Sequence, residues 1–191
     1  MTKENLKGKS AVVKNLRRKS VFRYALIGQG IIIGVTTGLI IALFRWLLIF
    51  ADGCRNRLVA YANTGVGPAL IAALVMLLLV LVIGWILRKE PESTGSGIPQ
   101  VEAELLGKKD MNWLSVLVSK ILGCALSIGG GLALGREGPS IQIGAMVGKG
   151  FARTNKRVLT EERYLMSCGA GAGLSAAFGA PLAGTIFCLE E

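Results

Sequence analysis

The acidic residue Glu137 stands in an otherwise apolar stretch, GLALGREGPSIQIGAMVGKG, which runs from Gly131 to Gly150. Glycine and proline follow it and favour the start of a helix, so we predict a helix over Pro139–Gly150. This pattern places an ionisable carboxylate beside the free backbone amides of a helix N-terminus. The alternative is that Arg136 and Glu137 lie in an interfacial loop and only pair with each other.

A second helix start with polar character follows the loop RKEPESTGSG, Arg88 to Gly97. Ile98 and Pro99 come next, and a proline at the first helical positions predicts a short helix over IPQVEAELLG. Ser96 directly before this helix would add a hydroxyl to its free amides, and together these groups can hold an anion. The alternative is that Ser96 is a simple N-cap.

The elements that must position these residues are those of a membrane protein. The chain has 191 residues, of which 52% are hydrophobic and 26 are glycine, a composition too apolar for an ordinary soluble domain. Ala25–Ala51 and Pro68–Leu87 are each long and apolar enough to span a bilayer. Two further apolar segments follow, Trp113–Leu134 and Tyr164–Leu189, and Pro181 divides the second. We therefore predict an all-α integral membrane protein of tilted and broken helices.

The net charge of +10 comes largely from the N-terminal end and indicates membrane topology, not nucleic acid binding. Eight basic residues precede the first apolar run, where Glu4 is the only acidic residue: Lys3, Lys7, Lys9, Lys14, Arg17, Arg18, Lys19 and Arg23. An excess of lysine and arginine marks the cytoplasmic side of a membrane protein. Residues 1–23 are thus predicted to be a basic cytoplasmic segment.

Other kinds of site find little support in the sequence. The four cysteines have no CxxC spacing and the chain has no histidine, which argues against a metal site. The run from Gly171 to Ala176 fits a GxGxxA dinucleotide fingerprint, and this would indicate a nicotinamide oxidoreductase. No βαβ pattern surrounds it, so we reject this interpretation and expect neither an enzyme nor a soluble cofactor. Broken helices whose N-termini point inward are typical of transporters that handle anions.

Three motifs, in order, resemble the CLC family of chloride channels and proton-coupled chloride exchangers, and the resemblance extends from about Tyr24 to the end of the chain. They are Gly95-Ser96-Gly97-Ile98-Pro99, Gly135-Arg136-Glu137-Gly138-Pro139, and Ala176 to Gly184 with Glu190-Glu191. Lys120 also falls where the family carries a lysine. The resemblance implies the N-terminal part of a bacterial-type member with a CLC-like helix bundle. Residues 24–191 would form a partial transmembrane domain, truncated within the first inverted repeat and lacking the second repeat.

The resemblance also implies roles for single residues. Gly95, Ser96, Gly97, Ile98 and Pro99, with Arg136, Glu137 and Gly138, would bind chloride, and Ser96 would contribute its hydroxyl. Glu137 would be the gate, because its ionised carboxylate competes with chloride and its protonation frees the anion position. Glu191 would transfer protons from the cytoplasmic side, while Glu190 would be structural. The alternative for both is an acidic pair at a helix end in contact with water.

Chloride transport coupled to protons is therefore the expected function, because family members that act as channels commonly lack an acid at the position of Glu191. The substrates would be chloride and protons, and no metal or cofactor is expected. A passive voltage- or pH-gated chloride channel and an inactive membrane fragment are the alternatives. The resemblance further implies a multi-pass protein of the plasma membrane, embedded in the lipid bilayer, which forms a homodimer if the missing half completes it.

Overall fold

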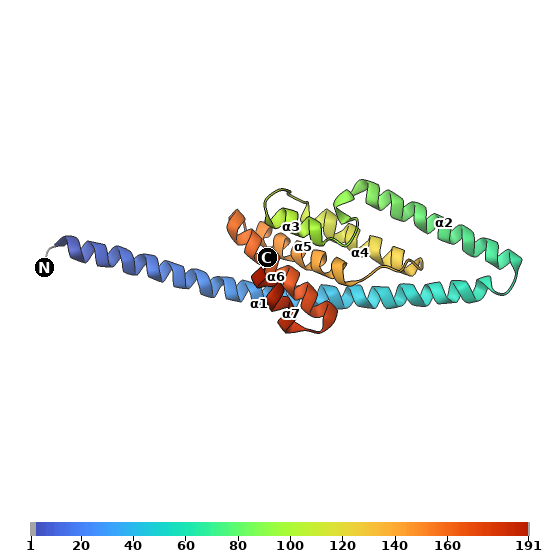
Figure 1. The fold of residues 1–191 in the computed structure, drawn as a ribbon, viewed down its shortest axis with the longest axis horizontal. Helices are drawn as coiled ribbons and strands as arrows, with labels where there is room; N and C mark the ends of the chain where they lie inside the picture. The colour runs from blue at the N-terminus through green and yellow to red at the C-terminus, as the bar shows by residue number, and fades with distance from the viewer. Residues whose placement is uncertain (1–2, 191) are drawn as a thin grey trace.

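The computed structural model describes the backbone of residues 3–190 and the side chains of residues 26–190. Within this part of the chain the regular structure is helical throughout, as the sequence predicts (Figure 1). The α-helices are α1 (Lys3–Ala62), α2 (Val66–Lys89), α3 (Ile98–Leu105), α4 (Trp113–Gly129), α5 (Glu137–Thr154), α6 (Leu159–Phe178) and α7 (Pro181–Glu190). A single 3-10 turn, Pro91–Ser93, lies between α2 and α3.

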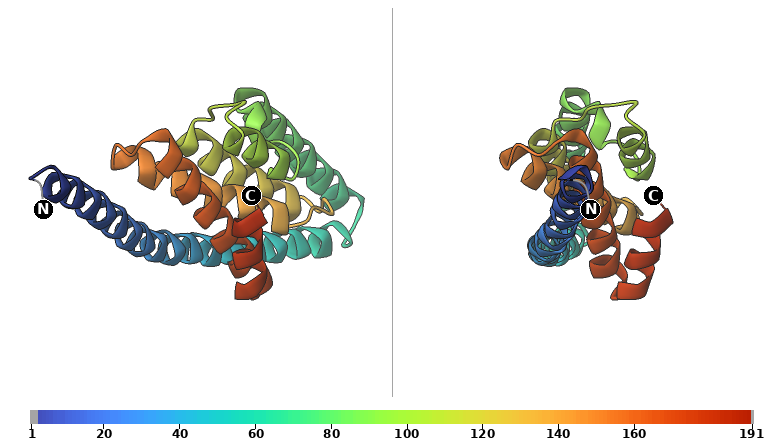
Figure 2. Two further views of the ribbon diagram at one scale, coloured as in Figure 1. Left: turned by 60° about the vertical axis from the view of Figure 1, so that its left-hand side comes forward. Right: turned by 90° about the vertical axis from the view of Figure 1, so that its left-hand side faces the viewer.

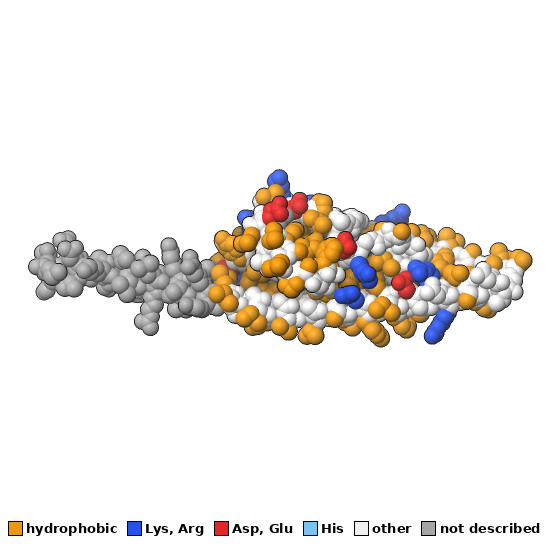
Figure 3. Space-filling view, turned by 60° about the horizontal axis from the view of Figure 1, so that its bottom comes forward, with side chains coloured by type: hydrophobic (Ala, Val, Ile, Leu, Met, Phe, Trp, Pro, Cys, Tyr) orange, Lys and Arg blue, Asp and Glu red, His pale blue; other side chains and the backbone are white. Residues whose placement is uncertain are grey.

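Helices α1 and α2 are long and apolar enough to cross a membrane, over Leu26–Ala62 and Val66–Lys89. Figure 1 shows α2 folding back beside the second half of α1 after a tight turn. Most of their large apolar side chains are exposed, as expected for helices that face lipid, and apolar side chains also cover much of the described surface in Figure 3. Helix α1 continues without a break through residues 23 and 24, where the boundary between the basic segment and the transmembrane domain was predicted.

Helices α5 and α6 form the centre of the bundle and pack backbone against backbone (Figure 2). A side chain at Gly144 or Gly173 would overlap a carbonyl oxygen of the other helix, from Gly169 and Ser140 respectively. Only glycine allows this close approach, which is how small residues mediate contact between membrane helices. The core on either side holds Ile143 and Met146, both fully buried.

Helix ends follow local sequence signals, with some differences from prediction. Asn112 caps α4, since its Oδ1 accepts hydrogen bonds from the backbone amides of Leu114 and Ser115 at 3.2 and 3.4 Å. The helix covers only part of the apolar segment Trp113–Leu134, because α4 ends at Gly129 and Gly131 has a φ of 89°. Helices α6 and α7 are separated before Pro181 as predicted, with Gly179 in the left-handed conformation at the C-cap of α6.

The predicted first span, Ala25–Ala51, ends before helix α1 does. The apolar run stops at Ala51, but α1 continues to Ala62 through a polar stretch that includes Asp52, Arg55 and Arg57. Charged residues end a hydrophobic pattern without ending a helix, since arginine and alanine favour the helix strongly. Helix α5 likewise begins at Glu137 and ends at Thr154, and so extends beyond the predicted Pro139–Gly150 at both ends.

Candidate anion site at two helix starts

The loop before α3 lies directly against the first turn of α5. A Cβ atom added at Gly138 would stand 2.7 Å from the carbonyl oxygen of Ser96 and 2.9 Å from its Cβ. Glycine at this position therefore allows two helix N-termini, which begin at Ile98 and Glu137 and are 39 residues apart in sequence, to meet. The amides of a first helical turn have no carbonyl four residues earlier to bond to, so both starts carry partial positive charge.

Gly97 is required by the local backbone as well as by packing. Its φ of 93° is in the left-handed region that favours glycine, and it is the N-cap residue of α3. A Cβ atom here would overlap the side chain of Gln142 on α5, 2.8 Å from its Cδ. Gln142 is fully buried, and its Nε2 donates to the carbonyl oxygen of Glu92 at 2.8 Å. The sequence analysis did not identify Gln142, although a glutamine in a buried helix is a signal of such a role.

Lys120 holds the same loop from inside the protein. Its side chain on α4 is buried, and its Nζ donates hydrogen bonds to the carbonyl oxygens of Ser93 and Gly95 at 3.0 and 2.8 Å. Gln100 adds a further bond from its Nε2 to the carbonyl oxygen of Thr94 at 3.0 Å. With two carbonyls drawn inward by an ammonium group, the loop is fixed immediately before the start of α3.

Ser96 and Glu137 are both exposed at this junction. The Oγ of Ser96 accepts a hydrogen bond from the backbone amide of Ile98 at 3.4 Å, which is the N-cap arrangement in a long form. Among the described side chains neither Arg136 nor Glu137 takes part in an ion pair within 4.0 Å, so the alternative that these two residues pair with each other finds no support. Glu190 is exposed in the last turn of α7, and Glu191 lies outside the described residues.

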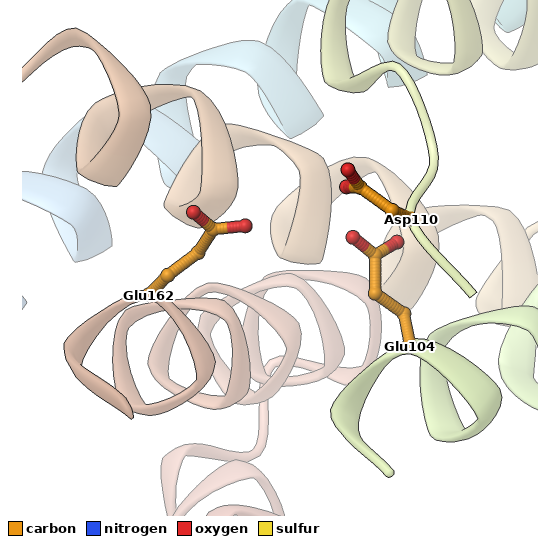
Figure 4. A group of neighbouring side chains, drawn as sticks. All are labelled: Glu104, Asp110 and Glu162. Atoms are coloured by element: carbon orange, nitrogen blue, oxygen red, sulfur yellow. The ribbon is translucent and has the colours of Figure 1, made fainter. Parts of the chain in front are cut away.

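Figure 4 shows a second group of charged residues, formed by Glu104, Asp110 and Glu162 from α3, the following loop and α6. Their carboxylate oxygens lie within 4.8 Å of one another, which is a spacing that could hold a metal ion. Lys149, fully buried, pairs with Glu104 and with Asp110, to which its Nζ is 2.7 Å distant. Arg153 pairs with Asp110 and with Glu162, so each of the three carboxylates already has a cationic partner. This group therefore joins α3, α5 and α6 as an ion-pair network.

Asp110 occupies the exposed side of this network, in the loop between α3 and α4. The hydrogen bond from Lys149 is the main cause that lowers the pKa of its carboxyl group, and the charges of Lys149 and Arg153 lower it further. No role was assigned to Lys149 or Arg153 from the sequence. Their shared partner Asp110 is 39 and 43 residues away in sequence, so no local pattern indicates this connection.

Comparison with known proteins assigns the chain to a family. The family model described as voltage gated chloride channel matches residues 79–191. The protein named H(+)/Cl(-) exchange transporter ClcA from Citrobacter koseri is 35% identical over 183 residues, covering 94% of this chain and 39% of the relative. Its namesake from Salmonella schwarzengrund is 35% identical over 182 residues, covering 94% of this chain and 38% of the relative.

A solved structure supports the same assignment. The crystal structure of a slow cyanobacterial Cl−/H+ antiporter is 35% identical, matches with a TM-score of 0.77, and covers 83% of this chain and 38% of that chain. This chain thus spans less than two fifths of the length of the relatives that it matches. A family model that matches more than half of the residues, a shared fold and three motifs in order agree, and the chain belongs to the voltage-gated chloride channel family.

Proposed function

We propose that this chain takes part in chloride transport across a membrane, as part of a chloride/proton exchanger. The observation that carries the proposal is the contact of Gly138 with Ser96, which brings the N-termini of α3 and α5 to one exposed serine hydroxyl. Two helix starts that converge on a hydroxyl provide the amides and the positive potential that an anion needs. The names of the relatives as H(+)/Cl(-) exchange transporters are consistent with chloride as that anion.

In this proposal the hydroxyl group of Ser96 donates a hydrogen bond to chloride. Its Oγ already accepts the amide of Ile98, and a hydroxyl has one donor in addition to its acceptor sites. The backbone of Gly95, Gly97, Ile98 and Pro99 shapes the α3 side of the site. Arg136, Glu137 and Gly138 shape the α5 side. Lys120 and Gln142 take no part in binding and keep the loop in position.

Glu137 is the proposed gate. Its carboxylate belongs to the first residue of α5, where it competes with chloride for the same helix dipole. Protonation removes its charge and leaves the position to chloride, which links anion entry to proton uptake. Glu191 is proposed to pass protons on the cytoplasmic side. We further propose a plasma membrane location with the N-terminus in the cytoplasm, a homodimer, and no cofactor.

The test is chloride efflux from liposomes with simultaneous proton recording, on the chain and on Glu137→Ala, with chloride binding measured by titration calorimetry. Proton-coupled efflux that Glu137→Ala uncouples, and chloride binding that Ser96→Ala weakens at least about tenfold through loss of a bond to a charged ligand, support the proposal. Arg57→Gln is the control, because Arg57 is exposed and distant in sequence from both helix starts. Efflux without proton movement would favour the channel alternative. Absence of both binding and efflux would refute the proposal for this chain.

A further inference from the structure

An apolar cavity of about 620 Å³ lies between α1, α2 and α4, at the end of the molecule away from the N-terminus. Figure 1 shows these three helices together at that end, with α2 and α1 forming an open hairpin. The volume is within the range of about 300–1,000 Å³ typical of sites for small ligands. None of the candidate anion-site residues lines it.

On α2 the cavity is lined by one face of the helix. Val75, Leu79, Val82 and Ile86 all line it, with the spacing of three and four residues that defines a single stripe. From Val75 to Ile86 an α-helix rises about 16 Å, at about 1.5 Å per residue. The hydrocarbon core of a bilayer is about 30 Å thick, so the stripe matches the depth of one leaflet.

On α1 the opposite wall rises about 12 Å from Leu47 to Arg55, and Leu58 lines the cavity about one turn further along the helix. Leu47, Phe50 and Leu58 line the cavity on this side, and Leu122 lines it on α4. These side chains carry no polar atom that could bind water. A cavity of this kind within a membrane favours an apolar chain over water, because its apolar lining offers water few hydrogen-bond partners and offers the chain van der Waals contacts.

Arg55 is the one charged residue that lines the cavity. From Leu26, where the apolar part of α1 begins, the helix rises about 44 Å to Arg55. Even when tilted, a helix of this length crosses a core of about 30 Å and reaches the headgroup layer, since the whole bilayer is about 40–45 Å thick. The guanidinium group is thus placed at the depth of lipid phosphates, in the leaflet opposite the N-terminus.

The guanidinium group retains donors for a ligand. Its Nη1 contacts the carbonyl oxygen of Ile128 at 3.3 Å and pairs with Asp52 at 3.0 Å, while its Nη2 reaches Asn56 at 3.5 Å. Five N–H bonds are available on an arginine, and its Nε makes no hydrogen bond with the described residues. Arg57 adds a second positive charge, so the net charge of Asp52, Arg55 and Arg57 together is positive.

We propose that this cavity binds one acyl chain of an anionic phospholipid, whose phosphate is held by Arg55. Charge and shape agree on this occupant. The apolar wall has the length of one leaflet and the arginine stands at the level of the phosphate. Arginine binds phosphate oxygens in a bidentate way. A zwitterionic headgroup also carries a phosphate, but its own choline cation compensates the phosphate charge, so Arg55 should prefer the anionic lipid of equal chain length. The inference does not depend on chloride transport.

The test is native mass spectrometry of the purified chain, titrated with phosphatidylglycerol and with phosphatidylcholine of the same acyl chains. We expect tighter binding of phosphatidylglycerol, and Arg55→Gln should weaken it about tenfold, the loss of one charge-assisted bond. Arg57→Gln is the matched control and should change affinity less than about twofold by the same measure, since Arg57 lies outside the cavity lining. Equal affinity of the wild-type chain and Arg55→Gln for phosphatidylglycerol would overturn the proposal.

A second pair of variants tests the acyl-chain position. Leu79→Trp fills the cavity and should abolish the phosphatidylglycerol adduct, whereas Leu78→Trp adds the same bulk on the exposed face of α2 and should not. Should Leu79→Trp fail to fold, as judged by circular dichroism, photo-crosslinking of the wild-type chain replaces it. A phosphatidylglycerol with a diazirine in its acyl chain should label peptides within 47–58 or 75–86. Labelling confined to other segments, or displacement by equimolar oleate, would contradict the proposal.

Discussion

Replacement of Gly144 by alanine tests the backbone contact between α5 and α6. The new Cβ atom would overlap the carbonyl oxygen of Gly169, and it would stand 2.9 Å from the carbonyl carbon of Gly169 and 3.2 Å from the Cα of Gly173. These are backbone atoms of a helix, so they cannot move away by a change of rotamer as side-chain atoms could. Restoring an ordinary separation of about 3.5 Å requires the helices to move apart by at least roughly 0.6 Å at this point.

The expected loss of stability follows from two opposing terms. Overpacking of a tight interface costs about 3 kcal/mol at the upper end of its usual range. Alanine in place of glycine favours a helix by about 1 kcal/mol, which leaves a net destabilisation of about 2 kcal/mol. Gly123→Ala on α4 is the control, because its Cβ would meet no atom within 4 Å. That variant should be up to about 1 kcal/mol more stable than the wild-type chain.

The assay is reversible unfolding in mixed micelles of dodecylmaltoside and sodium dodecyl sulfate, followed by circular dichroism. The midpoint should fall for Gly144→Ala and stay equal or rise for Gly123→Ala. If Gly144→Ala proves as stable as Gly123→Ala, α5 and α6 do not pack as closely as in the structure, and the close backbone contact at Gly144 is refuted.

Three further predictions concern the polar residues. Lys149→Met leaves Glu104 buried without its partner and should cost about 3–5 kcal/mol in the same unfolding assay, where a drop under about 1 kcal/mol would be contrary evidence. Lys120→Met deprives two carbonyls of their donor and should lower stability by about 2 kcal/mol, with Lys109→Met, whose ion pair is half exposed, as a near-neutral control. Because the pKa of Asp110 is lowered in the folded chain, its contribution to stability is present above the ordinary aspartate pKa of about 3.9 and is lost as the pH falls further. Melting temperatures between about pH 5 and pH 2 should thus decline less steeply for Asp110→Asn, and parallel curves would disprove this role.

The helix starts could be predicted from the sequence because their signals are local. Glycine and proline around Ile98 and Glu137 restrict the backbone within three residues, and the structure begins helices at both. The family resemblance also rested on contiguous motifs and was confirmed by the match over residues 79–191. The roles of single residues in chloride binding and gating stay predictions.

The contacts that hold the site could not be predicted, since they join distant segments. Lys120 bonds carbonyls 27 and 25 residues earlier, and a lysine in an apolar helix does not indicate which groups its ammonium will meet. Gln142 and Lys149 likewise bond to residues 50 and 45 positions earlier in the sequence. The predicted first span stopped short of the end of α1 for a different reason, because hydropathy marks the end of the apolar run and not the end of the helix.

The anchoring of the α3 loop has a consequence for the order of events during synthesis. Glu92 leaves the ribosome 50 residues before Gln142, whose amide holds its carbonyl. At about 5–20 residues per second, that interval is roughly 3–10 s. During that interval Gln100 and then Lys120 become available to the loop, but the carbonyl of Glu92 still lacks its partner. The candidate anion site is therefore completed late, when the central helix α5 is added, and a ribosome stalled before that helix would leave the carbonyl of Glu92 unpaired.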